Sequence, residues 1–472
     1  MEEMNRPQRP VNPRRRRKTK MQIFKEAYLP VIIAGAAFIF ILVCIVGSIV
    51  RSVEKGKLDK QAQQEAQQQE QMLATQEKTQ AQQLLTEAQQ LGVTYDYDGA
   101  IALIDSFPGN AADYPELAAF KESMVTAKEG LVAWSDPAQI PNLSLQMLIA
   151  DPQRAFHDDK FTYSFTRNFL TCQEFSAILE QLYAANYVLV NVSDVYTDQS
   201  GVFQANTVYL PEGKRPLILT QTNVNYHTYL TDSDGDKLPD SGGCGFASKL
   251  VFDENGALTC EYVDANNQTV TGAYDMIPIL NQFVQEHPDF SYQGAKAVIA
   301  LTAYDGLFGY RTNSAAERHF GTQVYEQEIA SAKQVADKLV QDGYELACYT
   351  YENKAYGNFT TEQLTADLNG WITEGASILD NITIFAYAQN SDIAQENTLY
   401  NDERLTPLTD AGFRIFLGFS AGGNTWSVMS DSYVRQGRIL LSPTNIKYHG
   451  EWFGGIFSPD TILDASRGEI PT

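Results

Sequence analysis

Histidine and cysteine, the residues that most often hold transition metals, are scarce in this chain. Its 472 residues include five histidines and five cysteines. No two histidines lie within ten residues of one another, and no Cys-x-x-Cys pair occurs. The sequence therefore gives no local signal for zinc or redox chemistry. It also lacks a Gly-x-Ser-x-Gly elbow, a P-loop and a Gly-x-Gly-x-x-Gly turn after a strand, which removes the local motifs of serine hydrolases and nucleotide-binding proteins.

Positive charge is also in short supply beyond the N-terminal residues 1–27. The chain has 35 Lys and Arg against 58 Asp and Glu, a formal net charge of −23. A protein this acidic repels nucleic acid and anionic wall polymers, so no nucleic-acid partner is expected. Neutral or cationic glycan, metal ions and protein partners remain open. The cations of the N-terminal tail form one block, Arg14, Arg15, Arg16, Arg17, Lys18, Lys20 and Lys25.

Charged residues are absent altogether from residues 31–50, VIIAGAAFIFILVCIVGSIV. At about 1.5 Å rise per residue, such a helix matches a hydrocarbon core of roughly 30 Å. We predict one transmembrane helix over 28–50. A secretory signal peptide is the alternative, but its apolar core is shorter and a small-residue cleavage site follows it. By the positive-inside rule the basic tail 1–27 stays cytoplasmic and everything after the helix is exported, as in a single-pass protein of the cell membrane.

Two helical segments are expected next. Residues 51–92 are rich in Gln, Glu, Lys and Ala and contain no proline, a composition that predicts a helical stalk. Apolar residues are too sparse there for a strong coiled-coil pattern, and homo-oligomerisation through the stalk remains open. Residues 93–135 show apolar spacings of three and four residues interrupted by Pro108 and Gly109, which predicts a helical hairpin similar to one tetratricopeptide unit.

From Ile140 onward, short apolar strands alternate with helical stretches. This alternation predicts an α/β architecture with parallel strands, and about seven strands favour a distorted (β/α)7-type barrel over 140–458, followed by a tail at 459–472. The predicted strands are YVLVNVSDV, PLILTQT, AKAVIALTAY, YELACYTY, NITIFAYA, FRIFLGFS and RILLSPT.

The residues that end these strands carry a family resemblance. The strand PLILTQT runs into Asn223 and Val224, and YELACYTY is followed by Asn353. In order and character the segments resemble the polysaccharide deacetylases, the NodB-homology fold of carbohydrate esterase family four, with a long insertion at about 224–294. The resemblance implies a metal-dependent deacetylase whose first motif, T-F-D-D-G, supplies two aspartates and whose second, H-x-x-x-H, supplies two histidines. In this chain Thr222 and Asn223 stand at the aspartate positions, and Tyr349 and Asn353 at the histidine positions.

These replacements favour a protein that has lost the metal site of the family. We expect a pseudoenzyme that binds or scaffolds glycan of the cell wall or cell surface, and the pattern does not favour zinc or another catalytic divalent metal. An active de-N-acetylase with ligands rebuilt from distant residues is the first alternative, and a structural, partner-binding envelope protein is the second. Residues near strand ends are the candidates for substrate binding: Tyr226, His227, Asp305, Tyr387 and Asp392.

One acidic loop has the spacing of a cation site. In TDSDGDKLPDSG four carboxylates occupy positions 1, 3, 5 and 9, which is similar to the calcium loops of thrombospondin type 3 repeats and dockerins. Calcium bound there would staple the insertion, and a solvated acidic turn is the alternative. A disulfide between Cys244 and Cys260 also remains open. The four carboxylates belong to Asp232, Asp234, Asp236 and Asp240.

Overall fold

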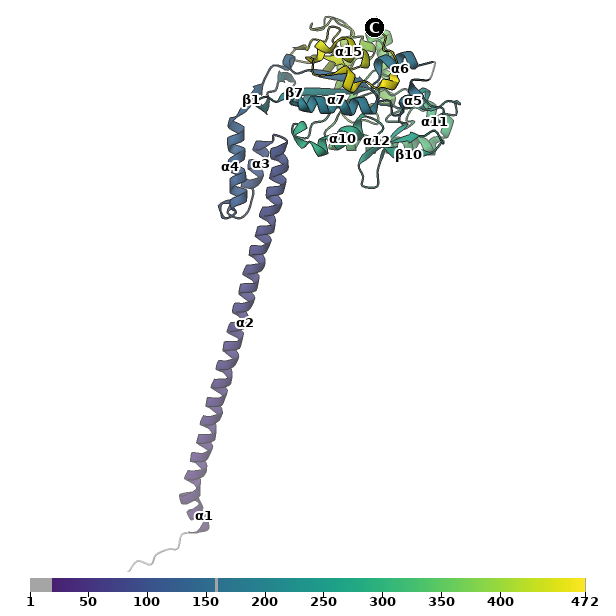
Figure 1. Ribbon diagram of the computed structural model, residues 1–472. Helices are drawn as coiled ribbons and strands as arrows, with labels where there is room; N and C mark the ends of the chain where they lie inside the picture. Colours follow the sequence, from purple (N-terminus) through teal and green to yellow (C-terminus); the bar gives the residue numbers. More distant parts are fainter. Residues whose placement is uncertain (1–18, 158–159, 472) are drawn as a thin grey trace, which may run out of the picture. The chain divides into compact units, whose positions relative to one another are not determined.

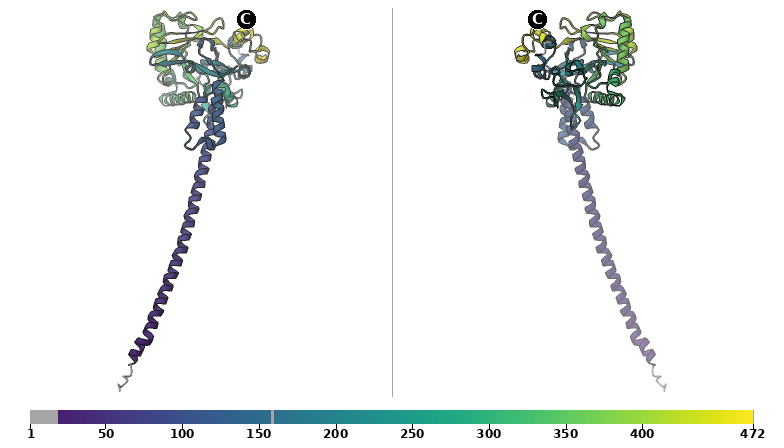
Figure 2. Two further views of the ribbon diagram at one scale, coloured as in Figure 1. Left: turned by 90° about the vertical axis from the view of Figure 1, so that its left-hand side faces the viewer. Right: turned by 90° about the vertical axis from the view of Figure 1, so that its right-hand side faces the viewer.

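The computed structural model describes residues 19–157 and 160–471, which form two units, Met1–Gln82 and Gln83–Thr472. The cationic block predicted at Arg14 to Lys18 lies outside the described residues. The first unit consists of α1 (Lys20–Ile23), a π-helical turn η1 (Phe24–Tyr28) and most of α2 (Leu29–Val93). Figure 1 and Figure 2 show α2 as one continuous helix.

The apolar part of α2 has no protein packed around it. Its large side chains are exposed, for example Val31 at 66% and Phe40 at 69%. Among the described residues, this is the one helix that is long and apolar enough to cross a membrane. The helix predicted ahead of the barrel is therefore present, and its exposed apolar surface is what a lipid-facing segment requires.

The second unit begins with the end of α2, which is followed by a helical hairpin formed by α3 (Tyr97–Asp105) and α4 (Pro115–Glu129). Asp96 caps α3, because its side chain accepts a hydrogen bond from the Gly99 N–H. Proline at the first position of α4 suits the start of a helix, where the backbone N–H has no partner. The chain then enters β1 (Leu131–Trp134), which pairs antiparallel with β6 (Val208–Pro211).

Seven parallel strands form a closed barrel, which confirms the predicted fold class. Neighbouring strands follow the order β11, β12, β13, β14, β16, β2 and β7, and β7 pairs with β11 to close the ring. All seven of these contacts are parallel. The strands are β2 (Asn142–Gln146), β7 (Arg215–Thr222), β11 (Val298–Leu301), β12 (Glu345–Cys348), β13 (Ile384–Ala386), β14 (Ile415–Phe419) and β16 (Val434–Leu440).

One member of the barrel differs from the prediction. The segment YVLV contains β3 (Tyr187–Leu189), which pairs with the N-terminal residues 215–217 of β7 and is not part of the ring. The missing strand is β2, whose sequence NLSLQ alternates Asn and Ser with Leu. Its leucines pack with the helices outside, whereas Asn142 and Ser144 face the lumen. Because its inward face is polar, the sequence of this strand is not a continuous apolar run, and the strand was not predicted.

Helices cover the outside of the barrel. Leu219, Ile299 and Phe385 pack in one cluster with side chains of α7 and α12, whereas Ala300 and Leu417 belong to a second cluster inside the ring. In Figure 1, α7 and α10 lie side by side over the barrel, and they also contact each other. The principal covering helices are α7 (Cys172–Ala184), α10 (Met276–Glu286), α12 (Thr322–Gln341) and α13 (Thr361–Glu374).

Shorter elements fill the connections of the second unit. The short helices are α5 (Pro152–Ala155), α6 (Thr162–Asn168), α8 (Val192–Val195), α9 (Thr228–Thr231), α11 (Ser314–Phe320), α14 (Leu405–Asp410), α15 (Pro443–Tyr448) and α16 (Pro459–Ile462). The remaining strands are β4 (Tyr196–Gln199), β5 (Val202–Ala205), β8 (Lys249–Phe252), β9 (Leu258–Val263), β10 (Thr269–Gly272) and β15 (Ser427–Met429).

The insertion after β7 contains an antiparallel sheet of β8, β9 and β10. Cys260 on β9 lies opposite Leu250 on β8, and both Cys244 and Cys260 are buried and form no disulfide. The disulfide left open by the sequence is therefore not formed here, because Cys244 precedes the hairpin rather than standing across from Cys260.

The segment expected as a tail at 459–472 is packed against the barrel over its described residues 459–471. Arg467 is 3% exposed and forms an ion pair with Glu174, which is fully buried on α7. The Arg467 Nε lies 2.9 Å from Glu174 Oε1, and its Nη1 donates to the carbonyl of Phe165. The C-terminal residues thus supply the charge that Glu174 needs in the core.

Candidate functional site at the barrel mouth

The carboxyl ends of β7 and β11 bring three polar residues together. Asn223 follows β7 directly, and its backbone N–H donates to the carbonyl of Ala300 on β11 at 2.8 Å. His227 lies in the loop after β7, and Asp305 lies in the loop after β11. Since loops at this end of a parallel barrel form its mouth, the fold places these side chains where ligands bind in such barrels. We call these three residues, together with Arg311 from the same loop after β11, the mouth cluster.

Both ring nitrogens of His227 point to neighbours within the mouth cluster. The Nε2 atom lies 2.8 Å from the side-chain amide oxygen of Asn223. The Nδ1 atom lies 3.4 Å from a carboxylate oxygen of Asp305 and has no well-aligned hydrogen bond. The His227 side chain is 1% exposed. Neither nitrogen is therefore turned toward a ligand.

Charge around Asp305 sets the protonation of the mouth cluster. Burial raises the pKa of Asp305, but His227, Arg311 and the Thr228 N–H together outweigh burial and lower this pKa below its usual value. The Arg311 Nη1 lies 3.7 Å from the Asp305 carboxylate, and the Thr228 N–H donates to it at 2.7 Å. Burial lowers the pKa of His227, Asp305 opposes that shift, and Arg311 adds to it. Near neutral pH an ionised Asp305 thus faces a neutral imidazole.

Aromatic rings run across the mouth on both sides of His227. Its ring stacks on Tyr304 at 5.0 Å and on Tyr229 at 5.6 Å between ring centroids. The line continues from Tyr229 to Phe161 at 5.7 Å and from Tyr304 to Tyr351 at 6.5 Å. Tyr229 is 46% exposed, and Phe161, Tyr304 and Tyr351 are half-buried. We call these five rings the aromatic row. Partly exposed aromatic faces beside a carboxylate suit the apolar faces and hydroxyl groups of sugar rings.

The lumen beneath the mouth is polar and holds a buried guanidinium. Arg438 on β16 is 2% exposed, and it donates to the carbonyls of Gly418 at 3.0 Å and Tyr387 at 2.6 Å. Its guanidinium lies 5.8 Å from the ring centre of Tyr349. Burial lowers the pKa of Arg438, and Tyr349 and Asp392 oppose this shift. Thr222, also buried, donates its hydroxyl to the carbonyl of Leu145 at 3.2 Å.

Three of the predicted binding residues lie elsewhere. Tyr226 is 1% exposed, and its hydroxyl donates to Asp275 at 2.8 Å, so it belongs to the packing of the insertion. Tyr387 is fully buried and accepts a hydrogen bond from the Tyr400 hydroxyl. Asp392 pairs with the buried Arg435 at 2.8 Å. Neither tyrosine is open to a ligand, and the Asp392 carboxylate is neutralised by arginine rather than offered to an ion.

Asn353 is the last of the positions inferred from the resemblance. It has a positive φ of 55° and is half-buried, and its side-chain oxygen has no hydrogen-bond partner. Its backbone carbonyl accepts a hydrogen bond from the Gln389 side chain at 2.7 Å. The structure therefore brings Asn223, His227 and Asp305 together, while Asn353 stands in a separate loop after β12.

Carboxylates converge in the acidic loop rather than at the mouth. Across residues 19–157 and 160–471, the one group of three or more His, Cys, Asp or Glu able to surround an ion is Asp232, Asp234 and Asp240, whose ligand atoms lie within 4.8 Å of one another. Asp236 is not in this group, and its side chain caps the N–H of Leu238. Oxygen donors of this kind suit a hard cation such as Ca²⁺.

Sequence reasoning missed three contributors to the mouth. Phe161 follows β2, the strand that was not predicted because its inward-facing residues are polar. Arg311 lies six residues after Asp305 and donates its Nη2 to the carbonyl of Tyr226 at 2.9 Å, a contact with no local signal in the sequence. Arg438 lies within a predicted strand, and the only sequence signal that it points inward is the alternation of side chains along β16.

No protein-family model and no curated protein matches the chain. Solved structures resemble it weakly. A deacetylase, PplD, from Streptococcus pyogenes in complex with acetate is 13% identical over 70% of this chain and 98% of that chain, with a TM-score of 0.34. A 4-alpha-glucanotransferase from Thermococcus litoralis is 11% identical over 38% and 27%, with a TM-score of 0.23. The carbohydrate deacetylase Agd3 is 10% identical over 70% and 40%, with a TM-score of 0.22. Similarity at this level assigns no activity to the chain.

Proposed function

We propose that this protein is a membrane-anchored, extracytoplasmic, polysaccharide-deacetylase-like protein that binds carbohydrate of the cell envelope without hydrolysing it. The aromatic row carries the proposal. It offers partly exposed rings beside an ionised carboxylate at the mouth of the barrel, and this combination suits sugar rings.

The mouth cluster favours binding over catalysis. A metal-dependent deacetylase needs about three protein ligands around an ion that generates a nucleophilic water. Here the Nδ1 atom of His227 faces Asp305, and its Nε2 atom forms a hydrogen bond with Asn223. Asp392 forms an ion pair with Arg435. Thr222, Asn223, Tyr349 and Asn353 stand where the family resemblance implies acids and imidazoles, and their hydroxyl and amide groups bind such ions poorly.

A glycan pull-down tests the proposal. The full-length protein in nanodiscs should bind immobilised chitooligosaccharide or peptidoglycan fragments, and Tyr229→Ala should weaken binding about tenfold through the loss of stacking. Tyr209→Ala is a matched control, since Tyr209 on β6 is 48% exposed against 46% for Tyr229 and lies outside the aromatic row. Equal binding by the two variants would refute the role of the row. Acetate release that depends on added Zn²⁺ or Co²⁺ would show instead a hydrolase with rebuilt ligands.

We also propose that the loop containing Asp232, Asp234 and Asp240 holds a structural Ca²⁺. The proposal is supported by the convergence of the three carboxylates. Backbone N–H groups donate hydrogen bonds that orient these carboxylates, such as the Lys237 N–H at 2.8 Å from Asp232 and the Gly242 N–H at 2.6 Å from Asp240. Calcium there would fix the start of the insertion and take no part in chemistry.

A further inference from the structure

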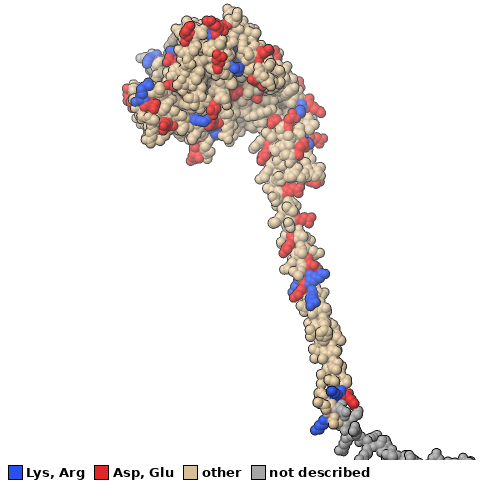
Figure 3. Space-filling view, turned by 180° about the vertical axis from the view of Figure 1, so that it is seen from behind, with Lys and Arg blue, Asp and Glu red and all other residues tan. Residues whose placement is uncertain are grey.

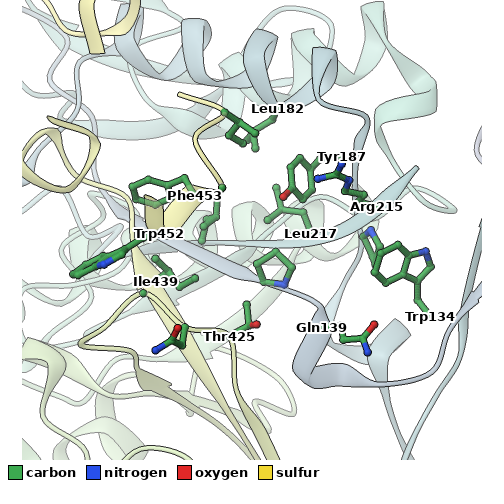
Figure 4. A pocket seen from close by; sticks show the side chains of 17 residues that line it. Trp134, Gln139, Leu182, Tyr187, Arg215, Leu217, Thr425, Ile439, Trp452 and Phe453 are labelled. Atoms are coloured by element: carbon green, nitrogen blue, oxygen red, sulfur yellow. The ribbon is translucent and has the colours of Figure 1, made fainter. Parts of the chain in front are cut away.

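A cavity lies on the outside of the barrel, apart from the mouth. It has a volume of about 500 Å³, within the range of sites for small ligands. Its floor is the outward face of β16, β2 and β7, represented by Ile439, Leu143 and Leu217. In Figure 4, Trp452 and Trp134 stand at opposite sides of this floor, and Tyr187 and Arg215 lie next to each other above it. We call this cavity the outer pocket.

Aromatic walls and polar edges give the outer pocket the character of a sugar site. Trp452 lies against Gly423, where an added Cβ would stand 2.0 Å from an indole atom, so only glycine allows this position of the ring. Gly423 also has a positive φ of 69°, which glycine adopts without strain. The side chains of Asn424 and Thr425 border the same cavity and offer hydrogen-bonding groups.

The charge of Arg215 indicates which class of ligand the outer pocket suits. Although acidic residues outnumber basic ones in the chain and are scattered over the face in Figure 3, Arg215 is the one charged side chain among the described residues that line the outer pocket. Its guanidinium lies 5.8 Å from the ring centre of Tyr187. Arg215 is exposed, and none of the ion pairs formed within residues 19–157 and 160–471 includes it. An arginine in this setting is suited to a carboxylate.

The floor argues against an extended peptide as the ligand. A peptide strand binds by adding to an open sheet edge. In the outer pocket β2 is paired on both sides, with β16 and with β7, and β7 is paired with β2, β3 and β11. No strand edge is therefore open at the floor within the described residues.

We propose that the outer pocket binds a sugar that carries a carboxylate, with its ring against the aromatic walls and its acid group on Arg215. This site is independent of the proposed glycan site at the mouth. A protein with both sites would hold two segments of envelope glycan at once, and the joint binding would exceed that of either site alone.

Two related disaccharides test the proposal. GlcNAc-MurNAc carries a carboxylate on its lactyl group, and chitobiose, GlcNAc-GlcNAc, lacks it. Binding is measured by calorimetry on the full-length protein in nanodiscs, in the Tyr229→Ala background, in which binding at the mouth is expected to be about tenfold weaker. We expect GlcNAc-MurNAc to bind at least about tenfold more tightly than chitobiose, and Arg215→Gln to abolish this preference. Arg318→Gln, which changes an exposed arginine on α11 outside the pocket, should preserve it.

A second variant covers the case in which a substitution disturbs the fold. Asn424→Asp is isosteric, exposed and within the pocket, so it should weaken GlcNAc-MurNAc and spare chitobiose by charge repulsion. Added salt should likewise weaken only the acidic sugar. The proposal is overturned if the two sugars bind equally, if neither binds, if Arg215→Gln keeps the preference, or if a short peptide with a free carboxylate displaces the sugar. Failure at the mouth would appear separately, as wild-type pull-down that Tyr229→Ala leaves unchanged.

Discussion

His227 shows how a single residue can look catalytic and yet be committed to structure. Its imidazole is stacked between two tyrosines, forms a hydrogen bond with Asn223 and faces Asp305. A general base needs a free nitrogen within reach of a substrate proton. Because both nitrogens are turned toward protein groups, His227 acts here as the support that holds Tyr229 and Tyr304 in line.

The burial of His227 makes a prediction about pH. Burial lowers its pKa in the folded chain, while the unfolded chain titrates near 6.5. Below that value the unfolded state binds the extra proton first, so stability due to His227 is lost as the pH falls through 6.5 toward the folded pKa. His227→Gln keeps a donor for Asn223 and removes this titration. The fall in urea midpoint between pH 7.5 and 5.5 should therefore be smaller in the variant than in the wild type.

His319→Gln is the control for that measurement, because His319 is exposed on α11. It should leave the pH dependence of the wild type intact. Comparison with the wild type also cancels other titrations, such as that of Asp194, whose pKa burial raises to about 6. An unchanged pH dependence in His227→Gln would show that the pKa of His227 does not shift on folding.

The ion pair between Glu174 and Arg467 predicts a large effect of one substitution on stability. Arg467→Ala leaves the Glu174 carboxylate buried without its cation, which typically costs about 3–5 kcal/mol. The urea midpoint of unfolding should fall accordingly. Lys333→Ala removes an exposed cation that pairs with Asp337 and Asp380 and should leave the midpoint nearly unchanged. Similar midpoints for the two variants would mean that the C-terminal segment is not part of the folded core.

At this scale the sequence predicted neighbours within one loop better than partners across the chain. Asn223 and His227 are four residues apart and were both assigned to the end of one strand. Tyr226 lies between them, but its positive φ of 48° turns it toward Asp275, a residue that no local pattern links to it. Asp392 is separated from Arg435 by 43 positions, so their pairing follows from the fold alone.

Among elements, β2 shows why strand patterns fail inside a polar barrel. Its lumen-facing Asn142 accepts a hydrogen bond from Thr220 on β7 at 2.8 Å and donates to Gln436 on β16 at 3.4 Å. Such pairing makes buried amides tolerable, because each polar group finds a partner. The closed ring of seven strands was predictable from the alternation of strands and helices. The identity of the seventh was not, since its inward residues resemble those of a solvent-facing strand.

The acidic loop gives a prediction for metal addition and removal. If Asp232, Asp234 and Asp240 hold Ca²⁺, added Ca²⁺ should raise the melting temperature of the full chain and EDTA should reverse the rise. Asp232→Asn should abolish the response. Asp253→Asn is a suitable control, since Asp253 caps a separate turn of the insertion through the N–H groups of Asn255 and Ala257. A melting temperature that ignores Ca²⁺, or that responds equally in both variants, would identify the loop as a solvated turn.

At the scale of the whole molecule, the two units differ in how much apolar surface they expose. Along α2 the large apolar side chains of residues 31–50 are exposed, whereas the barrel unit buries its apolar residues in two clusters. A water-exposed apolar helix of this length is unstable as part of a soluble protein. The helix is long and apolar enough to cross a membrane, and a cytoplasmic tail with an exported barrel remains the topology that the basic N-terminal residues predict.

A pair of charges in the apolar helix tests this placement. Asp at the centre of a membrane span costs about 2.5–3.5 kcal/mol per residue on insertion scales, so Ile39→Asp combined with Val43→Asp should release the full-length protein from carbonate-washed membranes. Val53→Asp combined with Leu58→Asp is the matched control, because these side chains are similarly exposed on α2 but lie beyond the apolar run. The control should stay in the membrane fraction. Retention of both double variants would mean that residues 31–50 do not anchor the protein.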